Sequence, residues 1–221
     1  AYFLHPDGPD GHSDVSFFGS KFERVAQKVD DDLFELAGVE VLHNGETVMI
    51  TRRQDPASTV NPAYAKTARD CPPFCIQPIK LAPGVETLGE REIIDYLVRM
   101  SKGDSSILVI DSRTPDWVKK GTIPGAVNIP WTALNPAKGA DPISIGEIME
   151  DQFGVTSLEG LWDYSNAKTL VLFCNGMWCG QSPNNIANLL KFGYPADKIK
   201  WYRGGMQNWS NLGLNSVKPA D

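Results

Sequence analysis

Apolar residues occur in short continuous runs in the second half of the chain, and amphipathic segments separate these runs. The segments at 107–111, 169–173 and 199–202 are mostly apolar, with Asp111, Thr169 and Lys200 as their polar members, and have the length of strands; a shorter one lies near 126–129. A strand that is covered on both faces of a parallel sheet is expected to be apolar throughout. Strands that alternate with helices predict an α/β fold, in which helices flank a parallel sheet.

The segments between these runs carry signals for helix starts and ends. Residues 87–90 read Thr-Leu-Gly-Glu, a capping box that predicts a helix ending at Gly103. A second box predicts a helix over 144–154. Ser182 is expected to cap a helix over 182–193. Two further helices are expected, at 114–121 and 204–213.

The amino-terminal part of the chain has a different pattern. Asn44-Gly45 is a favoured two-residue turn between β-forming segments, so residues 39–51 are predicted to form a β-hairpin. The proline-rich segment 54–85 lacks periodicity and is expected to be an ordered but irregular connection. Residues 1–16 are turn-forming and are expected to be a loosely held terminus, whereas 22–36 have a mixed helical periodicity.

The change of pattern near residue 86 predicts two parts. Residues 1–86 would be a small extension that contains the hairpin and a cysteine pair. Residues 87–221 would form the α/β domain, because all of the predicted alternating strands and helices lie there.

Composition and charge exclude some classes of partner. The 221 residues are 42% hydrophobic and 22% charged, which is ordinary for a globular protein. The formal net charge of −6 gives no electrostatic footprint for nucleic acid, so no such partner is expected. No apolar run approaches the length that spans a bilayer, so no membrane span is expected either.

Cys174 is the strongest candidate for a reactive group. It follows the predicted strand 169–173 directly and opens a loop that leads to the helix beginning near Ser182. Ligands of open α/β sheets bind at the carboxyl ends of the strands. Backbone N–H groups and a helix N-terminus favour an anion there, which includes a thiolate or a persulfide. The alternative is a buried cysteine with a structural role only.

Three segments of the sequence together resemble the signatures of rhodanese domains. The first is Ile110–Trp117 (IDSRTPDW), followed by 121–130 (GTIPGAVNIP). The second is Leu172-Phe173-Cys174 with its loop and helix, and the third is 202–209 (YRGGMQNW). The resemblance covers about residues 88–219 and implies the rhodanese fold, a parallel sheet with helices on both sides.

The resemblance also implies a sulfurtransferase without a cofactor or a metal ion. Cys174 would attack a small sulfur-donor anion such as thiosulfate, or a polysulfide, and become a persulfide. The outer sulfur would then pass to a thiophilic acceptor, a thiol or a protein. The loop after Cys174 would bind the substrate, and it comprises Asn175, Gly176, Met177, Trp178, Cys179, Gly180 and Gln181.

The sequence departs from the usual rhodanese pattern in this loop. An Arg often lies near the loop's end in the family, but 175–181 contain no charged residue. This weakens the case for a dianionic donor and argues against phosphatase chemistry on the same fold. Cys179 could resolve a persulfide, form a disulfide with Cys174, or be inert. Trp178 and Met177 could line a substrate site or pack beneath the loop.

Three other residues are expected to support the site. Asp111 and Arg113 recur in the family's pattern, and we favour an internal ion pair or loop anchor over substrate contact for them. Thr122 stands where the family often has a His. Arg203 follows the last predicted strand, and we hypothesise that it replaces the missing Arg of the loop.

Cys71 and Cys75 form a second local pair. Three residues separate them, which differs from haem-attachment and thioredoxin-type spacings. A structural disulfide is the preferred interpretation, and an accessory dithiol that serves Cys174 is the alternative. A disulfide, together with the small residue Ala1 at the start of the sequence, favours a periplasmic or otherwise exported protein over a cytoplasmic one.

The sequence leaves three functions open. The leading hypothesis is a sulfurtransferase that works through a persulfide on Cys174. The second is a thiol–disulfide redox protein that uses Cys174 and Cys179, coupled or not to the pair Cys71 and Cys75. The third is a non-catalytic binding module on a rhodanese scaffold, because one fold hosts many functions.

Overall fold

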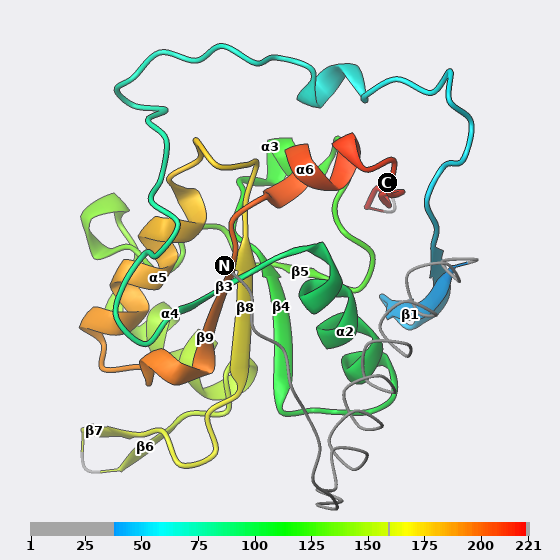
Figure 1. Cartoon of the computed structure of the whole chain (residues 1–221). Helices are drawn as coiled ribbons and strands as arrows, with labels where there is room; N and C mark the ends of the chain where they lie inside the picture. The colour runs from blue at the N-terminus through cyan, green and yellow to red at the C-terminus, as the bar shows by residue number, and fades with distance from the viewer. Residues whose placement is uncertain (1–37, 159, 220–221) are drawn as a thin grey trace, which may run out of the picture. The chain divides into compact units, whose positions relative to one another are not determined.

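A five-stranded, all-parallel sheet forms the centre of the fold in a computed structural model, which describes residues 38–158 and 160–219 (Figure 1). The interpretations of residues 1–16 and 22–36 therefore lie outside the described residues. The strand order is β3-β9-β8-β4-β5. The strands are β3 (Glu86–Leu88), β9 (Ile199–Tyr202), β8 (Thr169–Phe173), β4 (Ile107–Asp111) and β5 (Val127–Asn128). The predicted α/β fold is confirmed.

Helices cover both faces of this sheet. Successive side chains of a strand point to opposite faces, so each strand contributes to two separate buried clusters. In β8, Leu170 and Leu172 belong to one buried cluster, whereas Val171 and Phe173 belong to the other. The first cluster is completed by α4 (Pro142–Glu147), η3 (Ile148–Gln152) and α5 (Gln181–Lys191). The second is completed by α2 (Glu90–Ser101) and α6 (Gly205–Asn211). Both faces are thus buried, as the continuous apolar runs predict.

The predicted hairpin is present as β1 (Val39–His43) and β2 (Glu46–Ile50), which pair antiparallel. Val41 and Ile50 are buried in the same cluster as α2 and α6. The backbone N–H of Leu42 donates to the Ser101 hydroxyl at the end of α2, at 2.7 Å. The hairpin therefore contributes directly to the apolar layer on one face of the sheet.

Two predicted capping boxes are wrong in position. Thr87 lies in β3 and pairs with Trp201, and the helix starts after Gly89, whose N–H donates to Glu92 at 3.0 Å. The box is therefore shifted by two residues, because pairing with β9 keeps residues 86–88 extended. The second helix is capped by Asp141, which accepts from two backbone N–H groups, rather than by Ser144.

The cap predicted at Ser182 is also wrong. Helix α5 begins at Gln181 after Gly180, so Ser182 lies within its first turn. Its hydroxyl does not cap the helix but donates to the sulfur of Cys174, at 3.1 Å. The local sequence predicted that this hydroxyl would bond to backbone N–H groups of its own helix. It bonds instead to a sulfur that the fold brings within reach.

Several elements have no clear signal in the sequence. They are the edge strand β3, the hairpin of β6 (Thr156–Leu158) and β7 (Leu161–Asp163), and the short helices η1 (Pro62–Tyr64), η2 (Pro136–Lys138) and η4 (Ala196–Lys198). The short helix predicted at 114–121 is α3 (Pro115–Val118). Among the described residues, none of the helices has the length and apolar character needed to cross a bilayer.

Candidate active site

Cys174 lies at the carboxyl end of β8, the middle strand of the sheet. From β8 the chain continues to β9 on one side, and from β4 it continues to β5 on the other. The connections therefore diverge between β8 and β4, which is where open α/β sheets bind ligands. Asp111, the last residue of β4, and Arg113, just after it, lie at the same place.

The sulfur of Cys174 is buried and surrounded by hydrogen-bonding groups. The residue is 2% exposed. The Ser182 hydroxyl donates to its Sγ at 3.1 Å, and the thiol in turn donates to the carbonyl oxygen of Cys179 at 3.5 Å. The Cys179 side chain and the backbone N–H groups of Gly176 and Ser182 also hydrogen-bond to it. Apart from the accepting carbonyl of Cys179, the partners of this sulfur are uncharged donors suited to an anion.

These contacts favour the thiolate of Cys174. Burial by itself raises the pKa of the thiol, but the hydrogen bonds from Cys179, Ser182 and Gly176 outweigh it and lower the pKa to about 7. Cys179 behaves in the opposite way. Burial, together with its hydrogen bond to Cys174, raises the pKa of its thiol. Cys174 is therefore the cysteine that ionises near neutral pH, and Cys179 keeps its proton and can donate it to Cys174.

The alkylation rate of Cys174 by iodoacetamide is expected to rise with pH and level off above a midpoint near pH 7, because only the thiolate reacts. Ser182→Ala removes one donor to the thiolate, so the midpoint should move to higher pH. Mass mapping of the alkylated residue measures this. Ser165→Ala is the control, because its hydroxyl bonds to the exposed Asp163 instead. A wild-type midpoint at the ordinary value of 9.0 would contradict the assignment.

The first turn of α6 holds the loop from the other side. The backbone N–H groups of Met206 and Gln207 donate to the carbonyl oxygens of Cys174 and Asn175, each at 3.0 Å. This approach requires glycine at 205, where φ is +56° and a Cβ atom would lie on the carbonyl oxygen of Cys174. The glycine pair of the third signature is thereby explained.

Gly205→Ala is expected to destabilise the fold by more than about 1 kcal/mol, because the residue has a positive φ and no room for a Cβ atom. Urea denaturation measures the loss, and the pKa of Cys174 should change with it. Gly180→Ala is the matched control in the same loop. Its φ is −91° and a Cβ atom there meets nothing within 4 Å, so little change is expected. Equal losses in the two variants would contradict this account.

Asp111 and Arg113 form a fully buried ion pair below the loop. Their side chains are 1% and 0% exposed, and the Nη2–Oδ2 distance is 2.6 Å. Thr122, at the position where the family often has His, donates its hydroxyl to the same carboxylate at 2.7 Å. Arg113 Nη1 donates to Tyr64 Oη at 3.0 Å and to Asn175 Oδ1 at 3.4 Å. The pair therefore anchors the first residue of the loop.

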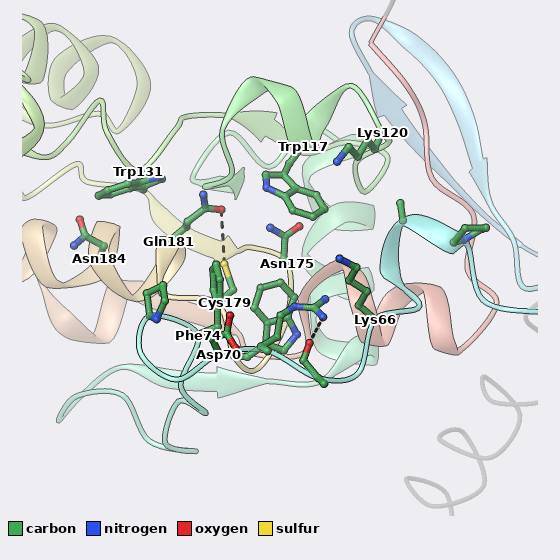
Figure 2. Close-up of a pocket in the computed structure, with 17 residues that line it drawn as sticks. Lys66, Asp70, Phe74, Trp117, Lys120, Trp131, Asn175, Cys179, Gln181 and Asn184 are labelled. Carbon is green, nitrogen blue, oxygen red and sulfur yellow. Dashed lines mark hydrogen bonds between the residues drawn. The ribbon is translucent and has the colours of Figure 1, made fainter.

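Residues 62–78 lie against the same loop (Figure 2). The N–H of Gln77 donates to the carbonyl of Met177 at 2.8 Å. The rings of Phe74 and Trp178 pack edge to face at 5.7 Å. A disulfide joins Cys71 to Cys75 and closes the turn that carries Phe74. The disulfide therefore lies next to the loop, because Phe74 between the two cysteines and Gln77 after them contact loop residues.

Arg203 is engaged by this segment. Its guanidinium donates to the carbonyl oxygens of Gln77 and Pro78, at 2.8 Å and 3.2 Å. It does not line the pocket described next. Its hypothesised part in anion binding therefore stays a prediction.

A pocket of about 930 Å³ opens over the loop, and its lining includes Asn175, Trp178, Cys179, Gly180 and Gln181. Figure 2 shows the side chain of Cys179 in it, with Sγ 3.7 Å from the Gln181 amide oxygen, which is the alternative acceptor for the one S–H that otherwise donates to Cys174. Cys174, Gly176 and Met177 are not among the lining residues; Met177 is exposed. Cys179 thus contacts the Cys174 sulfur on one side and the pocket on the other.

Sequence reasoning missed most of this pocket. Its walls include Trp117, Trp131 and Phe74, and its cations are Lys66, Arg69 and Lys120. These residues come from two segments about fifty positions apart, and no motif connects them. The part of Ser182 as a donor to Cys174 was missed for a different reason, because its place before Pro183 predicted a helix cap.

Comparisons with known proteins give the following similarities. The chain resembles the solved structures of human single-domain sulfurtransferase TSTD1 (22% identity, 57% of this chain, 95% of that chain, TM-score 0.35) and of Saccharomyces cerevisiae single-domain sulfurtransferase RDL2 (18%, 61%, 96%, 0.41). It also resembles the solved structure of a thiosulfate sulfurtransferase from Pseudomonas aeruginosa. The identity is 18%, the match covers 60% of this chain and 20% of that chain, and the TM-score is 0.39. No curated protein matches the chain.

The sequence also matches the family described as "Rhodanese-like domain", and the match extends over residues 94–212. This range is more than half of the chain and contains β4, β8 and β9, and hence Cys174 with its loop. The chain therefore belongs to the family of rhodanese-like domains.

Proposed function

We propose that this protein is a sulfurtransferase that carries a sulfane sulfur as a persulfide on Cys174. One observation carries the proposal most directly. The Cys174 sulfur lies at the carboxyl end of the central strand among uncharged hydrogen-bond donors, which lower its pKa to about 7. A thiolate is then available at neutral pH, and the same donors suit the negative terminal sulfur of a persulfide.

The reaction has two displacement steps. The Cys174 thiolate attacks the sulfane sulfur of an anionic donor, such as thiosulfate or a polysulfide. The new S–S bond forms as the donor's S–S bond breaks, and sulfite or a shortened polysulfide leaves with the electron pair. A thiol or protein acceptor, as its thiolate, then attacks the outer sulfur, and Cys174 leaves as a thiolate.

Roles for the other residues follow from this mechanism. The loop 175–181 would hold donor and persulfide, with Gly176 supplying a backbone N–H. The ion pair of Asp111 and Arg113 would keep the loop in place through Asn175. Arg203 would support the site through residues 77 and 78, to whose carbonyl oxygens it donates.

The burial of Cys174 limits how a sulfur donor can reach its sulfur atom. With 2% of the residue exposed, a donor must displace a neighbouring side chain before it reaches the sulfur. Cys179 is the neighbour that contacts both the sulfur and the pocket. We therefore propose that the Cys179 side chain moves aside when the donor enters.

The test is intact-mass spectrometry of the reduced protein before and after treatment with polysulfide. A gain of one sulfur atom that cyanide reverses would support the proposal. An absence of any gain, with the protein folded and both thiols reduced, would overturn it.

A thiol–disulfide redox protein is the second candidate, and it has a specific observation in its favour. The Cys179 side chain hydrogen-bonds to Cys174, so the two sulfurs are neighbours. Mild oxidation would then remove two hydrogen atoms and join them. The same mass measurement separates the candidates, since this loss without any sulfur gain favours the redox protein.

Two proposals concern the chain as a whole. We propose the division into an extension, 1–86, and a rhodanese domain, 87–221. We also propose export to the periplasm or another oxidising compartment, which the disulfide of Cys71 and Cys75 supports, because disulfides persist there and are rare in the cytosol.

A further inference from the structure

We propose that the pocket over the loop binds an organic anion with an aromatic body, and that the sulfur donor is such a molecule, an aromatic thiosulfonate or persulfide with a carboxylate or sulfonate across its ring, rather than inorganic thiosulfate. The inference rests on the proposed sulfur transfer at Cys174 and specifies the substrate class of that site. The size, the walls and the charge placement of the pocket carry it.

The pocket is large for an inorganic donor. Its volume of about 930 Å³ is within the range of sites that hold organic ligands and cofactors. Thiosulfate has the size of sulfate and would fill only a small part of it. An ion that small would leave most of the lining in contact with water, so the walls would contribute nothing to its recognition.

The walls are aromatic. Figure 2 shows Trp117 and Trp131 on one side and Phe74 on the other, with Asn175 and Cys179 between them. Trp178 packs against Phe74 and completes the lining from within the loop. Such rings stack on a flat apolar body and gain little from a small hydrated ion. A ligand with an aromatic ring is therefore the one that these walls recognise.

Positive charge surrounds the same space. Lys66, Arg69 and Lys120 line the pocket with one carboxylate, that of Asp70. None of these three cations makes a salt bridge within residues 38–158 and 160–219. Arg69 lies over Trp178 at 4.1 Å, and the Lys120 ammonium lies over the Trp117 ring at 4.0 Å. In a chain with a net charge of −6, this local excess of cations favours an anion.

The separation of charge from the nucleophile argues for an elongated donor. In thiosulfate the charged oxygens lie directly beside the transferable sulfur, so a cation would be needed in the loop. Residues 175–181 contain none, and the partners of Cys174 are uncharged. The cations come instead from the segments around residues 66–69 and 120. A donor with an anionic group on one side of an aromatic body and a sulfane sulfur on the other fits both regions.

An unpaired hydrogen-bond donor beside the pocket also favours an anionic ligand. The indole N–H of Trp131 is buried and has no hydrogen-bond partner in the described part of the chain. An unpaired buried donor is costly. A sulfonate or carboxylate oxygen in the pocket, which Trp131 lines, would remove that cost if the indole turned its N–H toward it.

Binding is tested apart from catalysis, with Cys174→Ser protein and non-transferable ligands. Calorimetric titration with benzenesulfonate should give affinity about tenfold higher than methanesulfonate, because only the former stacks on the aromatic walls. The double variant Lys66→Met/Lys120→Met should bind benzenesulfonate roughly fivefold more weakly. Lys119→Met is the matched control, since that lysine is exposed and does not line the pocket, and should bind as before.

Sulfur transfer is then measured in the wild type with 4-carboxybenzenethiosulfonate and thiosulfate. A kcat/KM for loading Cys174 that is about tenfold higher with the aromatic donor supports the proposal. Equal affinities for the two sulfonates, or faster loading by thiosulfate, would overturn it even though the protein transfers sulfur. Tight benzenesulfonate binding with no sulfur gain from either donor would support the ligand class of the pocket and overturn sulfur transfer itself.

Discussion

Cys174→Ser protein is expected to gain no sulfur when it is treated with polysulfide while the Cys71–Cys75 disulfide is kept intact, whereas the wild type gains the mass of one sulfur atom. The reason is chemical, because a serine hydroxyl stays protonated near neutral pH and does not attack a sulfane sulfur. The remaining cysteines do not substitute for Cys174. The pKa of Cys179 is raised, and Cys71 and Cys75 are joined in a disulfide.

Two controls separate loss of the nucleophile from loss of the fold. Circular dichroism and thermal melting of Cys174→Ser should match the wild type, since the two side chains have similar shape. Cys179→Ser keeps a hydroxyl that can donate to the thiolate, so it should still gain sulfur. Retained loading in Cys174→Ser would refute the assignment of the nucleophile. Loss of loading in Cys179→Ser would show that the second thiol takes part in the chemistry.

Asp111→Ala is expected to lower the free energy of unfolding by about 3–5 kcal/mol, because it leaves the guanidinium of Arg113 buried without its anion. The carboxylate accepts from Nε and Nη2 of Arg113 and from the Thr122 hydroxyl. Tyr64 and the Gly121 carbonyl would remain as partners, but neither carries a compensating charge. Urea denaturation of the purified variant measures the change.

Asp104→Ala is the matched control for this prediction. Asp104 pairs with Arg99 at 2.9 Å, but the two side chains are 30% and 48% exposed. Exposed pairs contribute little, so a far smaller change in stability is expected. If both variants lost a similar free energy of unfolding, burial would not be the reason that the Asp111–Arg113 pair stabilises the fold. Since Arg113 anchors Asn175, Asp111→Ala should also shift the pKa of Cys174.

The amino-acid sequence by itself determined the centre of the fold. The runs at 107–111, 169–173 and 199–202 are β4, β8 and β9 with the predicted bounds. They could be predicted because a strand buried on both faces is apolar at most of its positions, and this pattern is local; the interior exception is Lys200 in β9, which is half-buried and pairs with Glu86. The same pattern located Cys174, since a residue after such a strand lies at the sheet's carboxyl edge. Asn44-Gly45 located the hairpin through turn geometry alone.

Only the tertiary structure decided how the site is completed. Thr87 belongs to a strand because β9 offers it a partner, and the Ser182 hydroxyl turns to Cys174 because a sulfur lies within its reach. The cations and aromatic rings of the pocket, and the contact of Phe74 with Trp178, join segments that are distant in the chain. Such contacts depend on packing between elements rather than on local periodicity, so no pattern along the chain encodes them in a readable form.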